Sequence, residues 1–410
     1  MLTREENELL TRTGPGTPMG ALMRRYWIPA VFSHQLPEPD STPVRVRLLG
    51  EQLVAFRDTD GRIGLLDEHC PHRTVSLFFG RNEECGLRCV YHGWKFDVDG
   101  NCVDMPSEPP GSNFKHKVKT TAYPTLERGG VVWAYMGPPE LKPEFPDLEW
   151  TKVPQAHRFA SRHIQECNWL QGLEGGFDSS HLAFLHKGSV EGGPRIIPSH
   201  YEVIPADFGF IVGTGRDVSA SETEWSANVM LAPFHKIIAT VPHGAHVWVP
   251  MDDETTMLYS IDYMPNRPLS AEEIEQFEDG LHTHTENIPG TDRAAMNKSN
   301  NYLIDRALQK SGASFTGMKG LGIQDCALQE SMGPIADRTI EHLGVSDTAI
   351  IKIRRLLLKA VTDIEQGATP PGLSAASYRV RSARFRLPKG KPFPQAADEH
   401  VRIDKPAYAK

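Results

Sequence analysis

Short apolar runs separated by turn residues characterise the chain from about residue 43 to residue 137. Two pairs of these runs flank an Asp-Gly dipeptide, which is a strong signal for a tight turn between antiparallel strands. A further apolar run stops where a glycine and two prolines follow. The pattern predicts a domain built from β-hairpins. The runs are 53–57 and 62–66 around Asp60-Gly61, 94–98 and 101–103 around Asp99-Gly100, and 130–136 before Gly137-Pro138-Pro139.

The second half of the chain mixes two periodicities. Residues 245–249 and 257–263 follow the alternating pattern of strands with one covered face. From Ile350 to Ile364, apolar residues recur at spacings of three and four, which predicts a helix. Ser346-Asp347 can cap its start and Gly367 can end it. These patterns predict an antiparallel sheet packed with helices.

Three segments follow from this reading of the chain. Residues 1–26 are expected to form a polar, helical arm, and residues 27–147 the hairpin domain. The stretch 140–149 contains two prolines and several charges, which are typical of a linker. Residues 148–410 are expected to form a second domain of strands and helices. The predicted fold class is therefore α+β, with an all-β N-terminal domain.

Length and composition narrow the function classes. A chain of 410 residues with 39% hydrophobic content has room for two soluble domains. The net charge of −8 comes from interspersed acidic and basic residues, so there is no basic stripe for nucleic acid. No stretch approaches about 18 uninterrupted apolar residues, and the amino end lacks the apolar core of a signal peptide. We expect a cytoplasmic protein that neither spans a membrane nor binds nucleic acid.

Two short blocks combine cysteine with histidine. The first is Cys70-Pro71-His72 and the second runs from Cys89 to His92, and both follow predicted strands. Two thiolates and two imidazoles on paired loops can bind a [2Fe-2S] cluster, with both cysteines on one iron and both histidines on the other. A Cys₂His₂ zinc site uses the same ligand types but usually presents Cys-Cys and His-His blocks around a short helix. The mixed blocks favour the iron-sulfur cluster.

The remaining cysteines lie outside this pattern. Six cysteines are too few and too scattered for a disulfide framework in a long intracellular chain. Cys85 is close to the two blocks but has no assigned role. Cys102, Cys167 and Cys326 are expected to be buried thiols without a function.

A second group of candidate ligands lies at Asp178, His181 and His186. Asp178 and His181 are three residues apart and share a helical face, whereas His186 lies about 140° away from His181 on a regular helix. Both histidines can bind one metal only if the helix widens or breaks. Glycines at 172, 175 and 176 make such an irregularity plausible. These residues alone leave open a metal site or a glycine-softened helix with surface histidines.

Together, the two groups resemble those of a known family. The segments 70–73 and 89–96 are similar to the two cluster-binding loops of Rieske domains in aromatic ring-hydroxylating oxygenases. Respiratory Rieske proteins typically add one extra cysteine to each loop, and this chain lacks that pair. The segment 178–186 resembles the Asp-x₂-His-x₄-His motif of the same oxygenases. Glu174 stands where some dioxygenase branches carry asparagine, and this departure favours the branch that includes phthalate 4,5-dioxygenase.

The resemblance implies roles for these residues. Cys70, His72, Cys89 and His92 would hold one [2Fe-2S] cluster in each subunit. His181 and His186 would bind a mononuclear Fe(II), and Asp178 would orient His181 and connect it to the cluster of a neighbouring subunit. The segment 322–339 resembles the region that carries the third ligand, and Asp325 is our choice. Glu330 and Asp337 are its competitors, with helix capping or pairing to Arg338 as their alternative role.

The family also implies an activity and partners. The expected protein is the terminal oxygenase of a multicomponent system, with a curved catalytic sheet flanked by helices. It would use O₂ and electrons delivered from NADH by a separate flavin and [2Fe-2S] reductase. The expected assembly is a head-to-tail homotrimer, or a hexamer of stacked trimers.

The expected reaction is hydroxylation of an aromatic substrate, first of all cis-dihydroxylation of an aromatic carboxylate or a diaryl-ether acid. Arg216, on a predicted strand, is a weak candidate for binding the acid group. Monooxygenation with O- or N-dealkylation is the alternative reaction. A non-enzymatic Rieske electron carrier and a zinc-stabilised binding protein are the alternatives from other classes.

Overall fold

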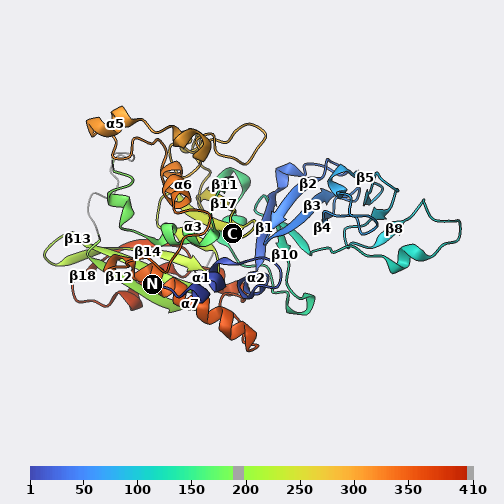
Figure 1. Cartoon of the computed structure of the whole chain (residues 1–410). Helices are drawn as coiled ribbons and strands as arrows, with labels where there is room; N and C mark the ends of the chain where they lie inside the picture. The colour runs from blue at the N-terminus through green and yellow to red at the C-terminus, as the bar shows by residue number, and fades with distance from the viewer. Residues whose placement is uncertain (188–197, 404–410) are drawn as a thin grey trace. The chain divides into compact units, whose positions relative to one another are not determined.

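The computed structural model describes residues 1–187 and 198–403, which form two compact units (Figure 1). The N-terminal unit comprises Gly14–Gly16 and Met23–Pro143, and the C-terminal unit comprises Met1–Thr13, Thr17–Leu22 and the chain from Glu144 onward. The division after Pro143 falls within the predicted linker. Most of the predicted arm belongs to the C-terminal unit. Residues 188–197 and 404–410 of the predicted second domain lie outside the described part.

The N-terminal unit contains three small antiparallel sheets, with strand orders β1-β10-β9, β2-β3-β4 and β5-β6-β7-β8. This agrees with the predicted all-β domain. Its strands are β1 (Trp27–Phe32), β2 (Val44–Leu48), β3 (Glu51–Arg57), β4 (Ile63–Asp67), β5 (Arg81–Glu83), β6 (Gly86–Arg88), β7 (Lys95–Phe96), β8 (Cys102–Asp104), β9 (Thr125–Arg128) and β10 (Val131–Tyr135).

The first predicted hairpin is confirmed and the second is shorter than predicted. β3 pairs with β4 in antiparallel register across Asp60-Gly61, and Gly61 takes a φ of +81°, which glycine adopts without strain. β7 covers only part of the predicted run 94–98. It ends early because the Asp97 carboxylate accepts the backbone N–H groups of Asp99 and Asn101, which folds this stretch into a turn.

The C-terminal unit is built on one eight-stranded antiparallel sheet with the order β11-β17-β16-β15-β14-β13-β12, and β18 pairs with β14 (Figure 1). The strands predicted at 245–249 and 257–263 are confirmed as parts of β16 and β17. The strands are β11 (Arg158–Gln165), β12 (His200–Ala206), β13 (Gly209–Asp217), β14 (Glu222–Leu231), β15 (His235–Ile238), β16 (His243–Pro250), β17 (Thr256–Tyr263) and β18 (Ala383–Pro388).

β17 differs from its prediction in one respect, because both of its faces are covered. Seven of its eight residues are buried, including the polar Thr256 and Ser260. β17 lies between β11 and β16 in the sheet. Its apparent alternation came from polar residues that are buried in the interior, so it does not mark a solvent-exposed face.

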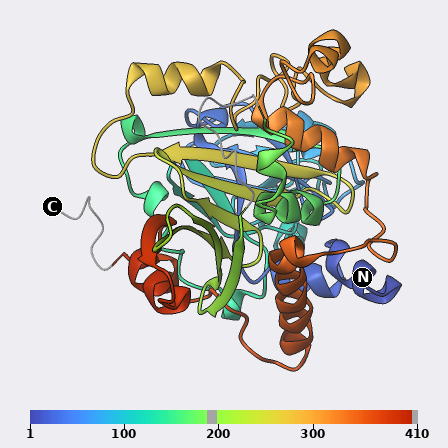
Figure 2. The same cartoon turned by 90° about the vertical axis from the view of Figure 1, so that its left-hand side faces the viewer.

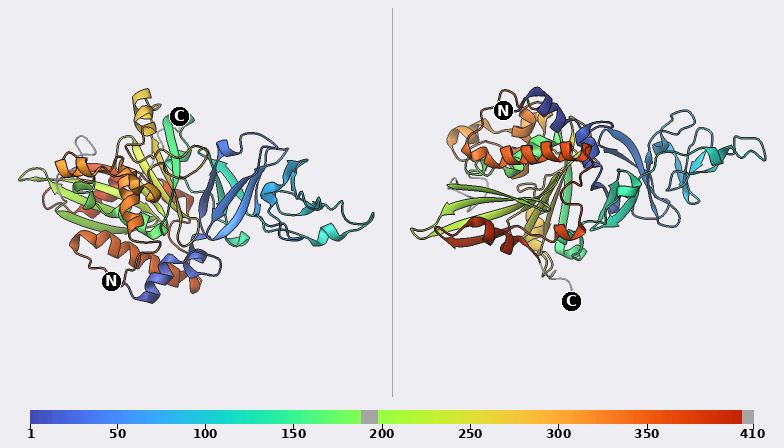
Figure 3. Two further views of the ribbon diagram at one scale, coloured as in Figure 1. Left: turned by 45° about the horizontal axis from the view of Figure 1, so that its top comes forward. Right: turned by 90° about the horizontal axis from the view of Figure 1, so that it is seen from below.

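Helices pack against this sheet. α3 and α6 lie side by side, and α3 covers β15 and β16. α8 packs on β13 and β18 (Figure 2), and the long α7 runs beside α1 (Figure 3). No helix in the described part of the chain is long and apolar enough to cross a membrane. The helices are α1 (Arg4–Thr11), α2 (Pro18–Met23), α3 (Trp169–Phe177), α4 (Ala271–Glu278), α5 (Arg306–Ser311), α6 (Leu321–Ser331), α7 (Thr348–Glu365) and α8 (Phe393–Val401).

α7 confirms the helix predicted from the apolar spacing. Ile350, Ile353, Leu357 and Val361 are buried on one face. The chain leaves the helix at Gly367, whose φ is +81°. Ile364 is only half-buried, because it lies in the last turn at the edge of the contact.

Candidate metal centres

The two Cys/His blocks of the N-terminal unit form matching turns. The carbonyl of Cys70 accepts the backbone N–H of Thr74 at 2.8 Å, and the carbonyl of Cys89 accepts that of Gly93 at 3.0 Å. Thr74 and Gly93 both have positive φ, at +57° and +78°. Each turn therefore starts with a cysteine and carries a histidine within it, two residues after Cys70 in the first turn and three residues after Cys89 in the second.

The turns bring like residues together. Cys70 and Cys89 are buried at the edge of the core of this unit. Burial, together with the neighbouring thiol of Cys89, raises the pKa of Cys70 to about 11. The rings of His72 and His92 have centroids 4.5 Å apart, and Trp94 stacks on His72 at 4.3 Å. The site thus has a buried thiol pair and a half-exposed imidazole pair.

This arrangement fits a two-iron cluster better than one zinc ion. Four tetrahedral ligands of a single zinc have donor atoms within roughly 4 Å of one another. In the described residues, three or more His, Cys, Asp or Glu ligand atoms lie within 4.8 Å of one another at two places, and neither includes these four residues. A [2Fe-2S] cluster needs one pair of ligands at each iron, which matches the separation into two pairs.

The second site begins at the end of α3. Asn168 caps the helix by accepting the N–H of Leu170, and the helix ends at Phe177, immediately before Asp178. A Cβ atom at Gly172 would lie 2.3 Å from the Trp248 ring, and one at Gly176 would lie 2.4 Å from it. These glycines therefore allow close packing on β16. The irregularity that these glycines made plausible is not found within α3, since the helix stays regular up to its end.

The helix break predicted from the histidine spacing lies at Asp178, so Asp178 and His181 do not share a face of one helix, as the spacing had suggested. His181 is on a 3-10 turn, His181–Ala183, and His186 follows that turn. Asp325 is on α6 and faces both imidazoles. Its Oδ1 lies 3.5 Å from Nε2 of His181 and 3.3 Å from Nε2 of His186. The structure thus brings His181, His186 and Asp325 together with ligand atoms within 4.8 Å of one another.

Two further side chains orient the imidazoles. Nδ1 of His186 lies 2.8 Å from Oε1 of Gln324, and because an amide oxygen only accepts, this nitrogen carries the proton. Nδ1 of His181 lies 3.5 Å from Oδ2 of Asp178. Both imidazoles can therefore hold a proton on Nδ1 and present an unprotonated Nε2 toward Asp325.

The electrostatics keep both aspartates ionised. Burial alone would raise the pKa of Asp325, but contact with His186, and the positive charge that each imidazole carries when it is protonated on both nitrogens, lower it below its ordinary value. The pKa of Asp178 is lowered as well. Burial alone would raise this pKa, but the contact with His181 outweighs the effect of burial. Two imidazoles and one carboxylate on one side of a metal, with positions left open, are typical of non-haem Fe(II) oxygenases.

Replacing Gln324 with leucine should weaken metal binding at this site. The variant loses the acceptor for the His186 proton, so the imidazole can rotate or change its protonated nitrogen. We expect Fe(II) affinity to fall about 10- to 100-fold, which chelator competition would measure. Gln276→Leu, on the exposed side of α4, is the matched control. Equal affinities for the two variants would show that Gln324 does not orient the ligand.

The competing carboxylates have other partners. Glu330 accepts the hydroxyl of Tyr302 at 2.5 Å and the N–H of Glu166 at 3.1 Å. Asp337 is exposed and accepts the N–H and hydroxyl of Thr339. These contacts account for both side chains without a metal.

Two other predicted residues also form ion pairs. Glu174 forms buried ion pairs with Arg338 and Arg354, at 2.9 and 2.6 Å. Arg216, the weak candidate for substrate binding, forms an ion pair with Glu224 on the neighbouring strand, with its Nε 2.9 Å from the carboxylate. This pairing supports a structural role for Arg216.

The second group of ligand-type residues, Asp58, Asp60 and Cys85, is less suited to a metal. The Asp58 carboxylate already accepts the backbone N–H groups of Asp60 and Arg62 and pairs with the Arg62 guanidinium. Its oxygens therefore have partners within their own turn. Cys85 remains without an assigned role, while Cys102, Cys167 and Cys326 are buried, as predicted.

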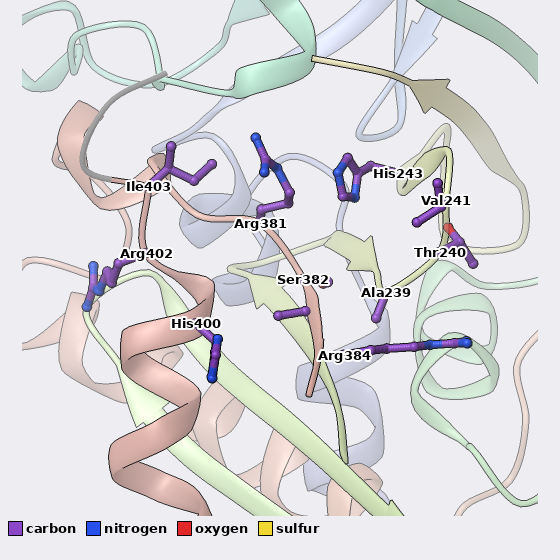
Figure 4. Close-up of a pocket in the computed structure, with 11 residues that line it drawn as sticks. Ala239, Thr240, Val241, His243, Arg381, Ser382, Arg384, His400, Arg402 and Ile403 are labelled. Carbon is purple, nitrogen blue, oxygen red and sulfur yellow. The ribbon is translucent and has the colours of Figure 1, made fainter. Parts of the chain in front are cut away.

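A cavity of about 730 Å³ in the C-terminal unit is lined by none of the triad residues (Figure 4). Its walls are basic, but two of the arginines have acidic partners. Arg381 donates to Glu149 and Arg402 donates to Asp207. Because no triad residue lines it, this cavity is separate from the metal site. The basic residues lining it are His243, Arg381, Arg384, His400 and Arg402.

Gln324 and Lys236 are site residues that the sequence analysis did not single out. Gln324 directly precedes the chosen ligand Asp325, but nothing in the sequence relates it to His186. Lys236 stands in β15 between His235 and the apolar pair Ile237 and Ile238, and a lysine in a largely buried strand is a signal that could have identified it.

The two candidate metal centres lie in segments of the chain that match two different families. Residues 26–124 match the family described as Rieske [2Fe-2S] domain, and residues 134–198 and 206–404 match the LigXa C-terminal domain like family. A solved structure of the NdmA QL mutant from Pseudomonas putida CBB5 with theobromine has a TM-score of 0.62 and 18% identity. It covers 91% of this chain and 99% of that one, so it shows the fold.

Three curated relatives match over most of their length. The phthalate 4,5-dioxygenase oxygenase subunit of Pseudomonas putida is 40% identical, over 94% of this chain and 92% of that protein. The 3-chlorobenzoate-3,4-dioxygenase oxygenase subunit of Comamonas testosteroni is 40% identical, over 98% and 99%. The 5,5'-dehydrodivanillate O-demethylase oxygenase subunit of a Sphingobium species is 34% identical, over 91% and 84%. The chain therefore belongs to the Rieske-type non-haem iron oxygenases, as an oxygenase component with one Rieske [2Fe-2S] domain and a LigXa-type C-terminal domain.

Proposed function

We propose that this oxygenase hydroxylates an aromatic acid, and that its reaction is cis-dihydroxylation of the ring. The observation that carries the proposal is the convergence of Nε2 of His181, Nε2 of His186 and Oδ1 of Asp325. This donor set suits Fe(II) and leaves coordination positions for O₂ and substrate. The two curated relatives at 40% identity have names that specify dioxygenases of aromatic acids.

The residues of the chain prepare the ligands and hold the protons. Gln324 accepts the Nδ1 proton of His186, and the Asp178 carboxylate, 3.5 Å from Nδ1 of His181, favours a proton on that nitrogen, so both Nε2 atoms stay available. When bound to these ligands, Fe(II) supplies the redox chemistry that activates O₂. The protein contributes ligand geometry and the charge of Asp325.

We infer that electrons reach this site from another copy of the chain. Asp178 lies beside His181, and its carboxylate would connect to the cluster ligand His92 of a neighbouring subunit in a head-to-tail trimer. Trimers could stack into hexamers. The curated relatives are named as oxygenase subunits, which supports a separate reductase as the source of NADH-derived electrons.

O-Demethylation of an aromatic ether is the second candidate reaction. The 34% identical O-demethylase relative supports it, because it shares most of the chain with this protein. The two reactions differ in where oxygen goes. Dihydroxylation places both atoms of O₂ in the aromatic product, whereas O-demethylation places one atom on the methyl carbon, which leaves as formaldehyde, and the other atom is reduced to water.

Metal analysis and labelled O₂ test the proposal. We expect about three irons per chain, two in the cluster and one at the triad. A non-enzymatic carrier would hold about two irons per chain, and a zinc protein would be colourless. With ¹⁸O₂, a surrogate reductase and a panel of aromatic acids and methyl ethers, a product with two labelled atoms supports dihydroxylation. An unlabelled phenol released together with formaldehyde would replace dihydroxylation with O-demethylation, and a ring product with a single labelled atom would replace it with ring monooxygenation.

A further inference from the structure

Lys236 lies on the sheet face that α3 covers. In the register of β15 and β16 it stands directly opposite His246, so both side chains point to the same side of the sheet. Trp248, two residues after His246, is on that face as well. The Trp248 ring fills the space beneath Gly172 and Gly176 of α3. Lys236 therefore points toward α3, in the direction of the triad.

The end of the Lys236 side chain reaches the residues just before Asp178. Its Nζ donates to the carbonyl of Gly176 and lies 5.4 Å from the centre of the Phe177 ring. Burial lowers the pKa of Lys236 to about 8, while the charges of Asp325 and Asp178 act in the opposite direction. The ammonium group is thus within electrostatic range of the candidate iron ligand and its neighbour.

No acidic side chain pairs with Lys236 within residues 1–187 and 198–403. An ammonium group has three donors, and here one of them has a protein acceptor, the Gly176 carbonyl. A half-buried cation without a counter-ion is costly, so an anionic ligand that pairs with it would be stabilised. With a divalent iron bound, Asp325 and Asp178 balance the charge of the metal. The charge of Lys236 then has no counterpart in the described site.

We propose that Lys236 binds the carboxylate of the aromatic acid substrate and so selects for acids at this site. The inference rests on the proposed function, because it assumes that substrate binds at the triad. It assigns to Lys236 the role expected of Arg216, whose guanidinium already pairs with Glu224. The competing role is structural, since the same lysine donates to a carbonyl in the last turn of α3.

The test compares acids with neutral analogues of equal size. Benzoate, 3-chlorobenzoate and phthalate are titrated against their amides by calorimetry, without O₂, into protein with iron loaded and the cluster oxidised. We expect the wild-type protein to bind at least one acid about 10- to 100-fold more tightly than its amide. Lys236→Met keeps most of the side-chain length and should abolish this preference, while amide binding is unchanged.

Three further variants separate charge from structure. Lys236→Gln has no charge but still carries a donor for the Gly176 carbonyl, so it should also lose the preference and serves if Lys236→Met fails to fold. Lys236→Arg should keep it. Lys359→Met, an exposed lysine on α7, should behave as wild type. Iron content and cluster absorption are measured in every variant.

Each of the following outcomes contradicts either the role of Lys236 or the proposed function on which that role rests. Equal loss of acid and amide binding in Lys236→Met and Lys236→Gln would mean that the lysine acts structurally. A preference for acids that survives both substitutions, or that the wild type lacks, would overturn the role of Lys236. If the wild type holds about two irons per chain, the proposed function fails instead. If the wild type holds three irons and incorporates oxygen, and the variants keep the preference for acids over amides, the proposed function stands and only the role of Lys236 is rejected.

Discussion

Asp325→Ala is expected to abolish turnover and remove one iron from each chain, while the visible spectrum of the cluster stays unchanged. Asp325 supplies the only carboxylate of the described triad, and its Oδ1 faces both imidazoles at 3.3 to 3.5 Å. Loss of a partner that only orients a ligand costs roughly 10- to 100-fold, so loss of the ligand itself should cost more. Iron content, absorption spectra and substrate-dependent O₂ uptake would measure the effect.

Asp337→Ala provides the matched control for this variant. Asp337 was a competing candidate for the third ligand, but it is exposed and bonds only to Thr339 among the described residues. We expect this variant to keep its full iron content and activity. If Asp325→Ala retained the third iron while Asp337→Ala lost it, the assignment of the triad would be wrong.

Glu174→Gln is expected to reduce the free energy of unfolding by about 3 to 5 kcal/mol, because it leaves the buried Arg338 without its carboxylate partner, while Arg354 keeps its second ion pair with Glu341. Arg338 has no exposed side-chain surface, and Arg354 is 3% exposed. Both donate to the Glu174 carboxylate, which links α3 to α7 and to the segment after α6. Because α3 leads directly to Asp178, the variant should also lower iron occupancy at the triad.

The comparison for Glu174 is Glu224→Gln. Glu224 also pairs with an arginine, Arg216, but that arginine is 38% exposed. Exposed ion pairs contribute only about 0 to 1 kcal/mol, so this variant should unfold close to the wild-type midpoint. Calorimetric unfolding of both variants measures the difference. Similar midpoints would show that the buried network contributes little to the stability of the C-terminal unit.

Local patterns predicted much of the fold. The hairpin around Asp60-Gly61 and the helix ending at Gly367 were predicted because turn geometry and helical periodicity depend on residues close in the chain. The second hairpin was overestimated, since the Asp97 side chain competes for backbone N–H groups. β17 was assigned one covered face because its buried polar residues resembled an exposed side.

The glycines of α3 show the same limit at the site. The sequence indicated that a helix with several glycines could deform, but it could not indicate the partner that requires them. That partner is Trp248, on a strand more than seventy residues later, which packs against Gly172 and Gly176. The helix break itself was correctly predicted from the spacing of His181 and His186, since two imidazoles five residues apart cannot face one point on a regular helix.

The sequence by itself determined the Cys/His blocks, the histidine pair and the family, because these depend on spacings within single loops. Only the tertiary structure shows which of Asp325, Glu330 and Asp337, which share one segment, lies beside the two histidines. It also joined Gln324 to His186, residues separated by 138 positions, and brought Lys236 beneath the end of α3. Contacts between distant segments depend on how the sheet and helices pack, and no local pattern in one chain encodes that packing.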